Sequence, residues 1–258
     1  MNKYNFISYP VLLLCSIMIC FLIIIQGCSS IRPDTDPLLD KRALIFAKEA
    51  KSYNKHILAS KGSGWARLET ETKYEKFKIA WAVVFPDKIR ITFLISANPI
   101  ETIIATGEKI TFISHTGEHK KHSYKSNNPD MEKYINVPVE MSEMILHLLG
   151  RLPLKNFDDT YFSTSDPSLS TIALRQKGAG ITQYFQFNDK KESSSLWLED
   201  YNRKLIYKTV IKEYKTYGAD NIPAKLEIKD SSKRKLTLEI TNFISNPFIK
   251  ESVFQLTD

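Results

Sequence analysis

Cysteine is scarce in this 258-residue sequence, and its placement limits the chemistry available to most of the chain. The three cysteines are Cys15, Cys20 and Cys28, so none occurs in the long part that follows. That part can form neither a disulfide nor a cysteine-ligated metal site, and it has no thiol nucleophile. Its stability must therefore come from an ordinary hydrophobic core.

Catalytic signatures are missing as well. The chain contains no GxSxG, GxxxxGK[ST], HExxH or CxxC pattern, which are typical of nucleophile elbows, phosphate-binding loops, zinc proteases and redox thiols. Gly62-Ser63-Gly64 lacks the Lys-Ser/Thr ending of a phosphate loop and indicates a helix stop. Asp158 and Asp159 are adjacent, as expected of turn residues rather than of an acid-base pair. We therefore expect no enzymatic activity, no catalytic residue and no cofactor.

One group of histidines has the composition of a metal site. His115, His119 and His122 are close in sequence, with Glu118 between them. If Thr116-Gly117 forms a two-residue hairpin turn, His115 pairs with Glu118 and His119 points to the opposite face. We therefore expect a solvated hairpin and no metal ligands.

Positive charge is in mild excess, with 36 Lys and Arg against 29 Asp and Glu. The excess is spread along the chain, which argues against a nucleic-acid partner, because such proteins concentrate cations where they meet phosphates. A mild excess does suit contact with anionic lipid headgroups.

The beginning of the chain has almost no charge. Lys3 is the only charged residue before Arg32, and an apolar run covers residues 11–25. A positive start, an apolar core and small residues directly after it are typical of a secretory signal peptide. The run is shorter than the ~20 residues that span a bilayer, although an uncleaved membrane anchor is the alternative.

The segment Ile25-Gln26-Gly27-Cys28 resembles the lipobox of bacterial lipoproteins. The resemblance implies cleavage before Cys28, which then carries a diacylglycerol and an N-acyl chain. Ser29 follows the cysteine, as in lipoproteins sorted to the outer membrane. We therefore expect residues 1–27 to be a signal peptide, residues 28–37 to be a lipidated tether, and the protein to be anchored at the periplasmic face of the outer membrane.

A helix is predicted directly after this tether. Asp36 is a typical N-cap and Pro37 favours the first turn, while apolar residues recur at helical spacing as far as Leu58. Gly62 and Gly64 are expected to end this helix.

From Trp65 onward the apolar period changes to two, which predicts strands. Two helices interrupt the strands, at residues 129–135 and 138–149, and Gly150 is the expected C-cap of the second. The predicted strands cover residues 77–85, 89–95, 100–106, 109–114, 170–177, 182–188, 196–200, 205–214, 224–229, 235–241 and 253–256. This layout predicts an α+β fold, in which a curled antiparallel sheet forms a half-open barrel and helices cover its open side.

Three short motifs occur in a characteristic order in the middle of the chain. Asn98-Pro99-Ile100 lies between two strands, Val137-Pro138-Val139 precedes the amphipathic helix, and Gly150-Arg151-Leu152-Pro153 follows it. This order resembles that of the LolB family of outer-membrane lipoprotein receptors over roughly residues 38–160. The resemblance implies a single LolB-like domain over residues 38–258.

LolB-like proteins take lipoproteins from a soluble LolA-type carrier and insert them into the outer membrane. The resemblance therefore implies a monomer that binds acyl chains of lipoprotein cargo. Asn98, Pro99 and Ile100 correspond to a loop that presents an apolar residue to the membrane, although Ile100 could equally pack in the core behind a tight turn. The expected lipid-binding cavity and its helical lid comprise Trp81, Phe85, Ile91, Phe93, Met141, Met144, Ile145 and Leu148.

Two other classes of protein stay open from the sequence. One is a lipid-anchored binding module of the same fold with another apolar ligand or an envelope assembly or sensor role, since a fold does not determine function. The other is a structural envelope lipoprotein with a filled core. A large apolar pocket would exclude the structural class, and a missing exposed loop at Ile100 would favour the binding module.

Overall fold

The computed structural model describes residues 37–135, 137–163, 171–188 and 192–255. Residues from Asp36 to Asp258 form one compact unit. The predicted signal peptide, Cys28 and most of the tether lie outside the described residues, so these interpretations stay predictions. The buried core side chains of the described chain all belong to residues between Ala43 and Phe254. A chain that starts at Asp36 therefore keeps the whole of this core.

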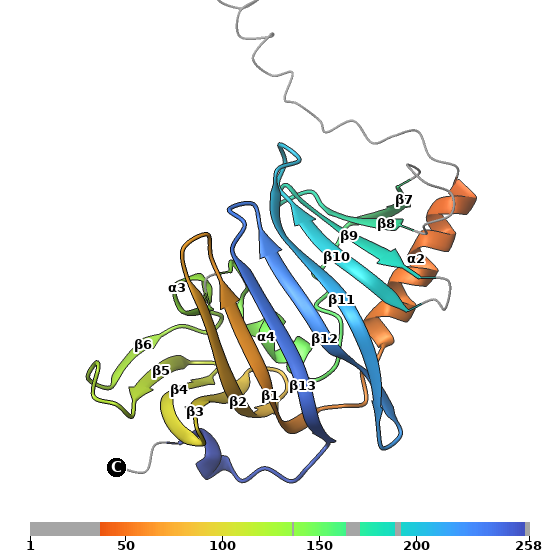
Figure 1. Ribbon diagram of the computed structural model, residues 1–258. Helices are drawn as coiled ribbons and strands as arrows, with labels where there is room; N and C mark the ends of the chain where they lie inside the picture. Colours follow the sequence, from red (N-terminus) through yellow and green to blue (C-terminus); the bar gives the residue numbers. More distant parts are fainter. Residues whose placement is uncertain (1–36, 136, 164–170, 189–191, 256–258) are drawn as a thin grey trace, which may run out of the picture. The chain divides into compact units, whose positions relative to one another are not determined.

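A single antiparallel sheet of thirteen strands dominates the described chain (Figure 1). Its first six strands are β1 (Ala59–Glu69), β2 (Tyr74–Val84), β3 (Lys88–Ile95), β4 (Asn98–Thr106), β5 (Lys109–Ser114) and β6 (His122–Lys125). The other seven are β7 (Asp159–Phe162), β8 (Thr171–Gln176), β9 (Ile181–Phe187), β10 (Ser193–Glu199), β11 (Leu205–Tyr217), β12 (Asp220–Asp230) and β13 (Lys235–Ser245).

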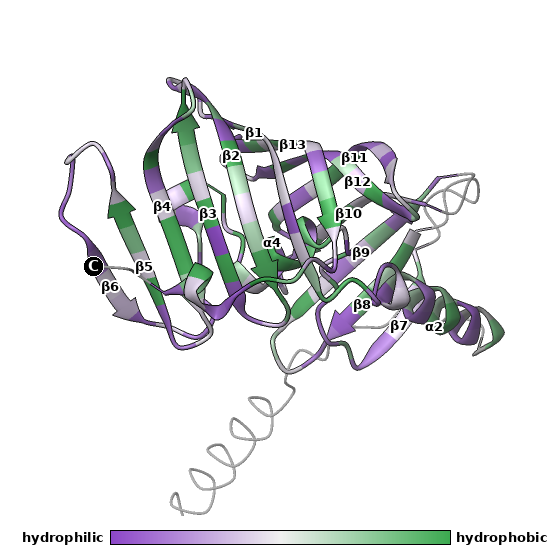
Figure 2. Ribbon diagram, turned by 90° about the horizontal axis from the view of Figure 1, so that it is seen from below, coloured by the Kyte–Doolittle hydropathy of each residue, from purple (hydrophilic) through white to green (hydrophobic). Residues whose placement is uncertain are grey.

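The strand order is β6-β5-β4-β3-β2-β1-β13-β12-β11-β10-β9-β8-β7. Strands that are neighbours in the sheet are also consecutive in the chain, except where β1 pairs with β13. The first and last strands of the chain thus meet within the sheet, and its two free edges, β6 and β7, come from the middle of the sequence. The sheet curls without closing, as Figure 2 shows. This architecture confirms the predicted half-open α+β fold.

Helix α2 (Pro37–Ser52) packs beside β7 and β8 at one edge of the sheet (Figure 1). It buries three small side chains, those of Ala43, Ala47 and Ala50. The helix is shorter than predicted because Asn54 has a φ of 53°, in the left-handed region that asparagine adopts more readily than most residues. Leu58 therefore lies outside the helix.

Gly62 and Gly64 lie inside β1 and do not end a helix, which corrects the prediction. A Cβ atom on Gly62 would lie 2.2 Å from Cζ2 of Trp81 and 2.4 Å from the carbonyl oxygen of Asn242. A Cβ atom on Gly64 would lie 2.2 Å from the carbonyl oxygen of Glu239. Both glycines are therefore required by close packing around β1, since any side chain would collide with these atoms.

The chain between the two free edges crosses the concave side of the sheet. This interior segment, residues 129–157, contains α3 (Glu132–Ile135) and α4 (Met141–Leu148). Figure 2 shows α4 inside the curve of the sheet. The segment contributes ten buried apolar side chains to the main core: Met131, Ile135, Val137, Val139, Met141, Met144, Ile145, Leu148, Leu149 and Leu152. The concave side is thus filled by the protein's own chain.

A second, smaller core lies on the opposite face of the sheet. Phe254 packs there with Ala82 and Ile104, and it belongs to the 3-10 helix η1 (Glu251–Phe254). The prediction of a strand over residues 253–256 is wrong for its described part, because these apolar side chains cover the sheet and do not pair with it. None of the helices in the described part of the chain has the length and apolar character needed to cross a membrane.

Candidate functional site

Helix α4 is the centre of the candidate site, because it occupies the concave face on which the sequence predicted a cavity. A helix that is buried on nearly all sides must be surrounded by other elements. The four predicted lid residues are at most 3 % exposed and share one core with the strands: Met141, Met144, Ile145 and Leu148. The methionine side chains are flexible and adapt to irregular apolar shapes.

Three of the four predicted cavity residues belong to the same core. Trp81 and Ile91 are buried cross-strand partners of β2 and β3, and Phe93 is half-buried against them. Phe85 differs, because its ring is exposed at the end of β2 and lies 4.8 Å from Cζ of Arg151. The structure therefore brings sheet and lid residues together as packed neighbours.

Ser60 joins β1 to the C-terminal end of α4. Its hydroxyl group donates a hydrogen bond to the carbonyl oxygen of Leu148 at 2.7 Å and accepts one from Nε1 of Trp81 at 3.1 Å. All three groups lie inside the protein, so each depends on the others for its hydrogen bonds. Ser60 thus holds the last turn of α4 against β1 and β2.

Glu143 joins α4 to β11 through a buried polar cluster. The hydroxyl of Tyr207 donates to Oε1 of Glu143 at 2.6 Å, and Nζ of Lys155 lies 3.2 Å from the same oxygen. Burial raises the pKa of Tyr207 well above its ordinary value. Burial alone would lower the pKa of Lys155, but the carboxylates of Glu143 and Glu140 raise it above its ordinary value. The buried carboxylate therefore has a cation and a hydroxyl donor beside it.

Arg151 fastens the chain after α4 to the segment between α2 and β1. Its guanidinium group donates to the carbonyl oxygens of Asn54 at 3.0 Å, Ile57 at 2.6 Å and Lys55. Gly150, with a φ of 68°, supplies the predicted left-handed cap between α4 and this arginine. The Gly-Arg-Leu-Pro exit thus ends the helix and attaches it to the sheet.

These polar attachments were missed at the sequence level. Glu143 and His147 lie outside the apolar stripe of α4, yet both are buried. Their spacing of four residues puts them on one helical face. Ser60, Tyr207 and Lys155 come from distant parts of the chain, so no local pattern links them to α4.

Because His147 is buried in its neutral form, the free energy of unfolding is expected to depend on pH. Its Nε2 has no hydrogen-bond partner among the described atoms, and burial lowers its pKa from 6.5 to about 4. As pH falls from 6.5 towards 4, His147 is therefore protonated in the unfolded state but stays neutral in the folded state. The free energy of unfolding should fall by about 3 kcal/mol over this window.

Chemical denaturation of the wild type and of His147→Met at several pH values measures this contribution. The variant should lose the His147 share of the pH dependence while carboxylates continue to titrate in both proteins. Parallel pH profiles of the two proteins would contradict the prediction.

The exposed apolar residue at the β3–β4 turn is Ile95. Ser96 and Ala97 form the turn, with φ values of 49° and 69°, and Ile95 pairs with Asn98. Ile95 is 53 % exposed, whereas Ile100 is half-buried within β4. The exposed apolar turn is thus present, but its apolar residue is Ile95: Asn98 is next to the turn, Pro99 is exposed, and Ile100 is half-buried in β4.

The histidines do not form the hairpin that the sequence predicted. Phe112 of β5 pairs with His122 of β6, so residues 115–121 form a longer loop. His119 contacts Glu101 at 3.0 Å, and His115 contacts Thr102 at 2.9 Å. No group of three or more possible metal ligands of the His, Cys, Asp and Glu types occurs in the described part of the chain.

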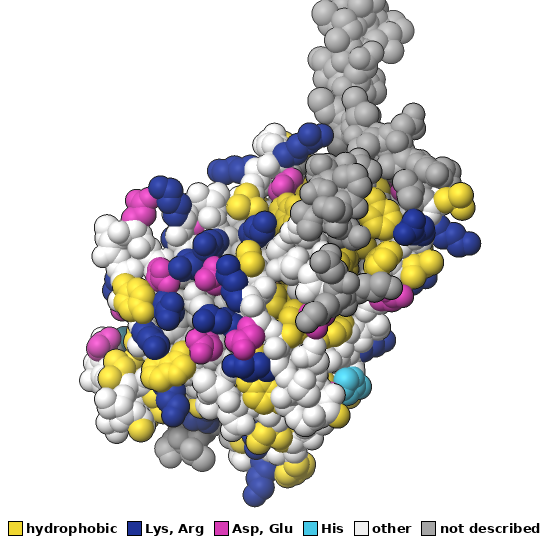
Figure 3. Space-filling view, turned by 45° about the vertical axis from the view of Figure 1, so that its right-hand side comes forward, with side chains coloured by type: hydrophobic (Ala, Val, Ile, Leu, Met, Phe, Trp, Pro, Cys, Tyr) yellow, Lys and Arg dark blue, Asp and Glu magenta, His cyan; other side chains and the backbone are white. Residues whose placement is uncertain are grey.

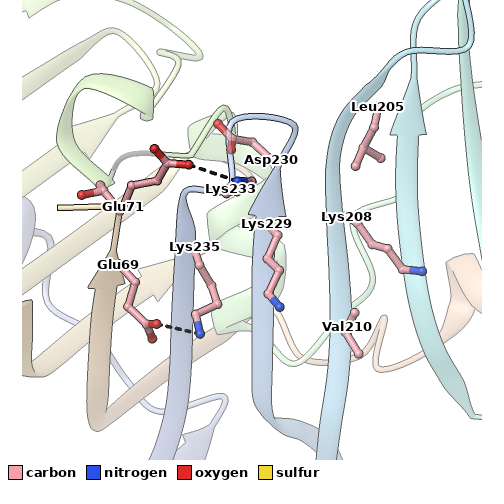
Figure 4. A pocket seen from close by; sticks show the side chains of 10 residues that line it. Glu69, Glu71, Leu205, Lys208, Val210, Lys229, Asp230, Lys233 and Lys235 are labelled. Atoms are coloured by element: carbon pink, nitrogen blue, oxygen red, sulfur yellow. Dashed lines mark hydrogen bonds and ion pairs between the residues drawn. The ribbon is translucent and has the colours of Figure 1, made fainter. Parts of the chain in front are cut away.

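A hollow of about 510 Å³ lies on the face of the sheet opposite α4 (Figure 4). Cross-strand neighbours on this face are charged, whereas the next residues along the strands, such as Leu68 and Leu236, point to the core. Figure 3 shows cations and anions interspersed over the surface. Two ion pairs cross the hollow, between Lys235 and Glu69 at 2.8 Å and between Lys233 and Glu71 at 3.2 Å. An acyl chain bound there would cover these charged groups, which costs free energy.

Comparisons with known proteins support the fold. No protein-family model and no curated protein matches the sequence. Among solved structures, the chain is similar to a domain from Vibrio parahaemolyticus described as an outer membrane lipoprotein-sorting protein, with a TM-score of 0.55, 10 % identity, and coverage of 84 % of this chain and 97 % of that one.

Two further structures have similar values. A LolA superfamily protein from Nitrosomonas europaea has a TM-score of 0.55 at 8 % identity, over 83 % of this chain and 97 % of its own. A DUF1329 family protein from Desulfovibrio piger has a TM-score of 0.54 at 11 % identity, over 86 % and 98 %. The chain therefore has a LolA-like fold.

Proposed function

We propose that this chain is a membrane-anchored receptor of the LolB type, which holds acyl chains of lipoproteins on the concave face of its sheet and helps to insert them into the outer membrane. Lipid on Cys28 would hold it at the periplasmic face. A LolA-type carrier would deliver the cargo. Acyl chains need such an escort because each CH₂ moved into water costs about 0.8 kcal/mol.

The observation that carries this proposal is the way in which α4 fills the concave face. Its apolar side chains cover the strands, while its direct polar links to the sheet are the hydrogen bonds of Ser60 and Tyr207. The interior segment is connected at its two ends to β6 and β7, the strands at the free edges of the sheet. Release of the helix would expose an apolar surface, which acyl chains would cover again. Exchange of one apolar occupant for another costs little free energy compared with exposure of the face to water.

Trp81 is expected to report this exchange by fluorescence. It lies under α4, and its indole is bound to Ser60. The chain has three tryptophans, and Trp65→Phe with Trp197→Phe leaves Trp81 as the only emitter. A synthetic triacylated lipopeptide with brominated acyl chains, which quench indole on contact, should quench Trp81 in a chain that starts at Asp36. The same lipopeptide without bromine is the control for indirect effects.

The possible outcomes separate the three classes of protein. Quenching, followed by delivery of the lipopeptide to vesicles, supports the receptor. Quenching without delivery supports a binding module with an apolar ligand. Binding of the lipopeptide without quenching places the acyl chains elsewhere on the protein, and no binding to the folded chain indicates a structural lipoprotein with a permanently filled core; either result overturns the proposal.

A further inference from the structure

Four large apolar side chains are exposed where β1 begins and where β2 and β13 end. Their exposed fractions are 83 % for Phe248, 56 % for Leu58, 51 % for Ile244 and 43 % for Phe85. We refer to these four residues as the end patch. Buried positions are the usual place for such side chains, so a group of them in water suggests a contact surface.

Backbone contacts bring the members of the end patch together. The amide of Phe85 donates to the carbonyl oxygen of Leu58 at 2.8 Å. Ile244 pairs with Lys61 in the β1–β13 ladder, and Nζ of Lys61 donates to the carbonyl oxygen of Phe248 at 3.3 Å. Residues distant in sequence thus converge at one end of the sheet. At the lower end in Figure 3, hydrophobic side chains lie beside Lys and Arg side chains.

Three lysines without a carboxylate partner lie near the end patch. Lys55 and Lys250 are exposed, and Lys61 is half-buried. None of the three has a described carboxylate within ion-pair distance, whereas two nearby carboxylates, those of Asp220 and Glu251, already contact His56 and Lys88. Apolar side chains with unpaired lysines beside them match the boundary of an anionic bilayer. There, apolar groups enter the acyl region and ammonium groups stay among the headgroups.

The end patch is also connected to the interior segment. Phe85 lies over Arg151 at 4.8 Å, and Arg151 holds the exit of α4 to the segment between α2 and β1. A medium that draws Phe85 away from Arg151 would weaken this attachment. Through Phe85, the end patch thus contacts the residue that attaches the exit of α4.

We propose that the end patch is the surface through which the folded domain docks on an anionic lipid bilayer, in addition to any lipid anchor. The side chains of Phe248, Leu58 and Ile244 enter the acyl boundary, and the three lysines contact headgroups. A bilayer fits better than a folded partner because Phe248 projects almost completely into solvent, which suits insertion into a soft medium. This docking needs no cargo, so it can fail or succeed independently of the receptor function.

Vesicle sedimentation with a chain that starts at Asp36 tests the proposal without the anchor. The chain should bind vesicles of phosphatidylcholine with phosphatidylglycerol and bind pure phosphatidylcholine more weakly. Phe248→Ser should weaken binding to the anionic vesicles by about tenfold. Lys61→Gln with Lys250→Gln should reduce the preference for anionic vesicles. Tyr201→Ser is the matched control, because Tyr201 is an aromatic residue that is 80 % exposed outside the patch.

Three results would overturn the inference. One is that the wild-type chain does not bind vesicles although circular dichroism shows that it is folded. Another is equal loss of binding in Phe248→Ser and Tyr201→Ser. The third is a dimer in gel filtration that Phe248→Ser abolishes while vesicle binding is unchanged, which would assign the patch to a second copy of the chain.

Discussion

Replacement of Glu143 by leucine is expected to lower the free energy of unfolding by about 3 to 5 kcal/mol. The substitution takes one of two carboxylates from the partly buried ammonium group of Lys155, which keeps Glu140 at 3.1 Å, and it removes the acceptor of the buried Tyr207 hydroxyl. Unpaired buried polar groups cost more than the hydrogen bond itself contributes. Urea denaturation measures the loss.

The pair Glu143→Leu with Lys155→Met is the control for this result. Removal of both charges leaves no buried ion without a partner, because Glu140, which also loses Lys155, reaches solvent, so much of the lost stability should return. Tyr207→Phe should be milder than Glu143→Leu, because it removes one neutral donor. If the double variant is less stable than Glu143→Leu alone, the ion pair is not what makes the single substitution costly.

The same variant connects stability to the proposed function. If Glu143 holds α4 on the concave face, its loss favours the open form. If the substitution destabilises the closed form and leaves the open form unchanged, the apparent affinity for acyl chains rises by about tenfold for each 1.4 kcal/mol of this destabilisation. Titration of the folded variant with the brominated lipopeptide measures this, and an unchanged affinity would separate the Glu143 cluster from lipid entry.

Gly62→Ala is expected to have a comparable effect, a loss of at least about 3 kcal/mol. The added Cβ atom would lie 2.2 Å from the Trp81 ring and 2.4 Å from the Asn242 carbonyl oxygen. The ring could move, but the carbonyl oxygen belongs to the backbone of β13. The variant should therefore be recovered partly unfolded or with a much lower denaturation midpoint.

Two further variants control the Gly62 prediction. Gly178→Ala adds the same atom in open space, and its stability should stay within about 0.5 kcal/mol of the wild type. Trp81→Leu in the Gly62→Ala background should restore stability only in part, since the clash with β13 persists. Full stability of Gly62→Ala would show that β1 can move away from its neighbours.

The strands were predictable because their signal is local. Alternation of apolar and polar side chains arises wherever one face of a sheet is buried, and residues 89–93 of β3 follow it. Predictions failed where a local pattern fits two structures. A pair of glycines such as Gly62 and Gly64 is found both at helix ends and in strands with closely packed neighbours. The apolar residues of η1 fit two roles as well, since they could pair as a strand or pack on the face of the sheet.

The candidate site was only half accessible from the sequence. The apolar stripe of α4 and the core positions of Trp81 and Ile91 follow from periodicity. The locations of Glu143 and His147 do not, because a helix with one apolar face is expected to leave its other face in water. The structure buries that face too, since the curl of the sheet brings β11 to its far side.

By itself, the sequence determined the fold class, the strand-rich layout and the position of the helix that fills the concave side, because all of these depend on short-range periodicity. It also contains the lipobox-like segment, whose role stays a prediction. Only the tertiary structure decided that β1 pairs with β13, that β6 and β7 are the free edges, and that Leu58, Phe85, Ile244 and Phe248 are all exposed at one end of the sheet. These features depend on contacts between residues far apart in the chain, and such contacts leave no periodic trace in a single sequence.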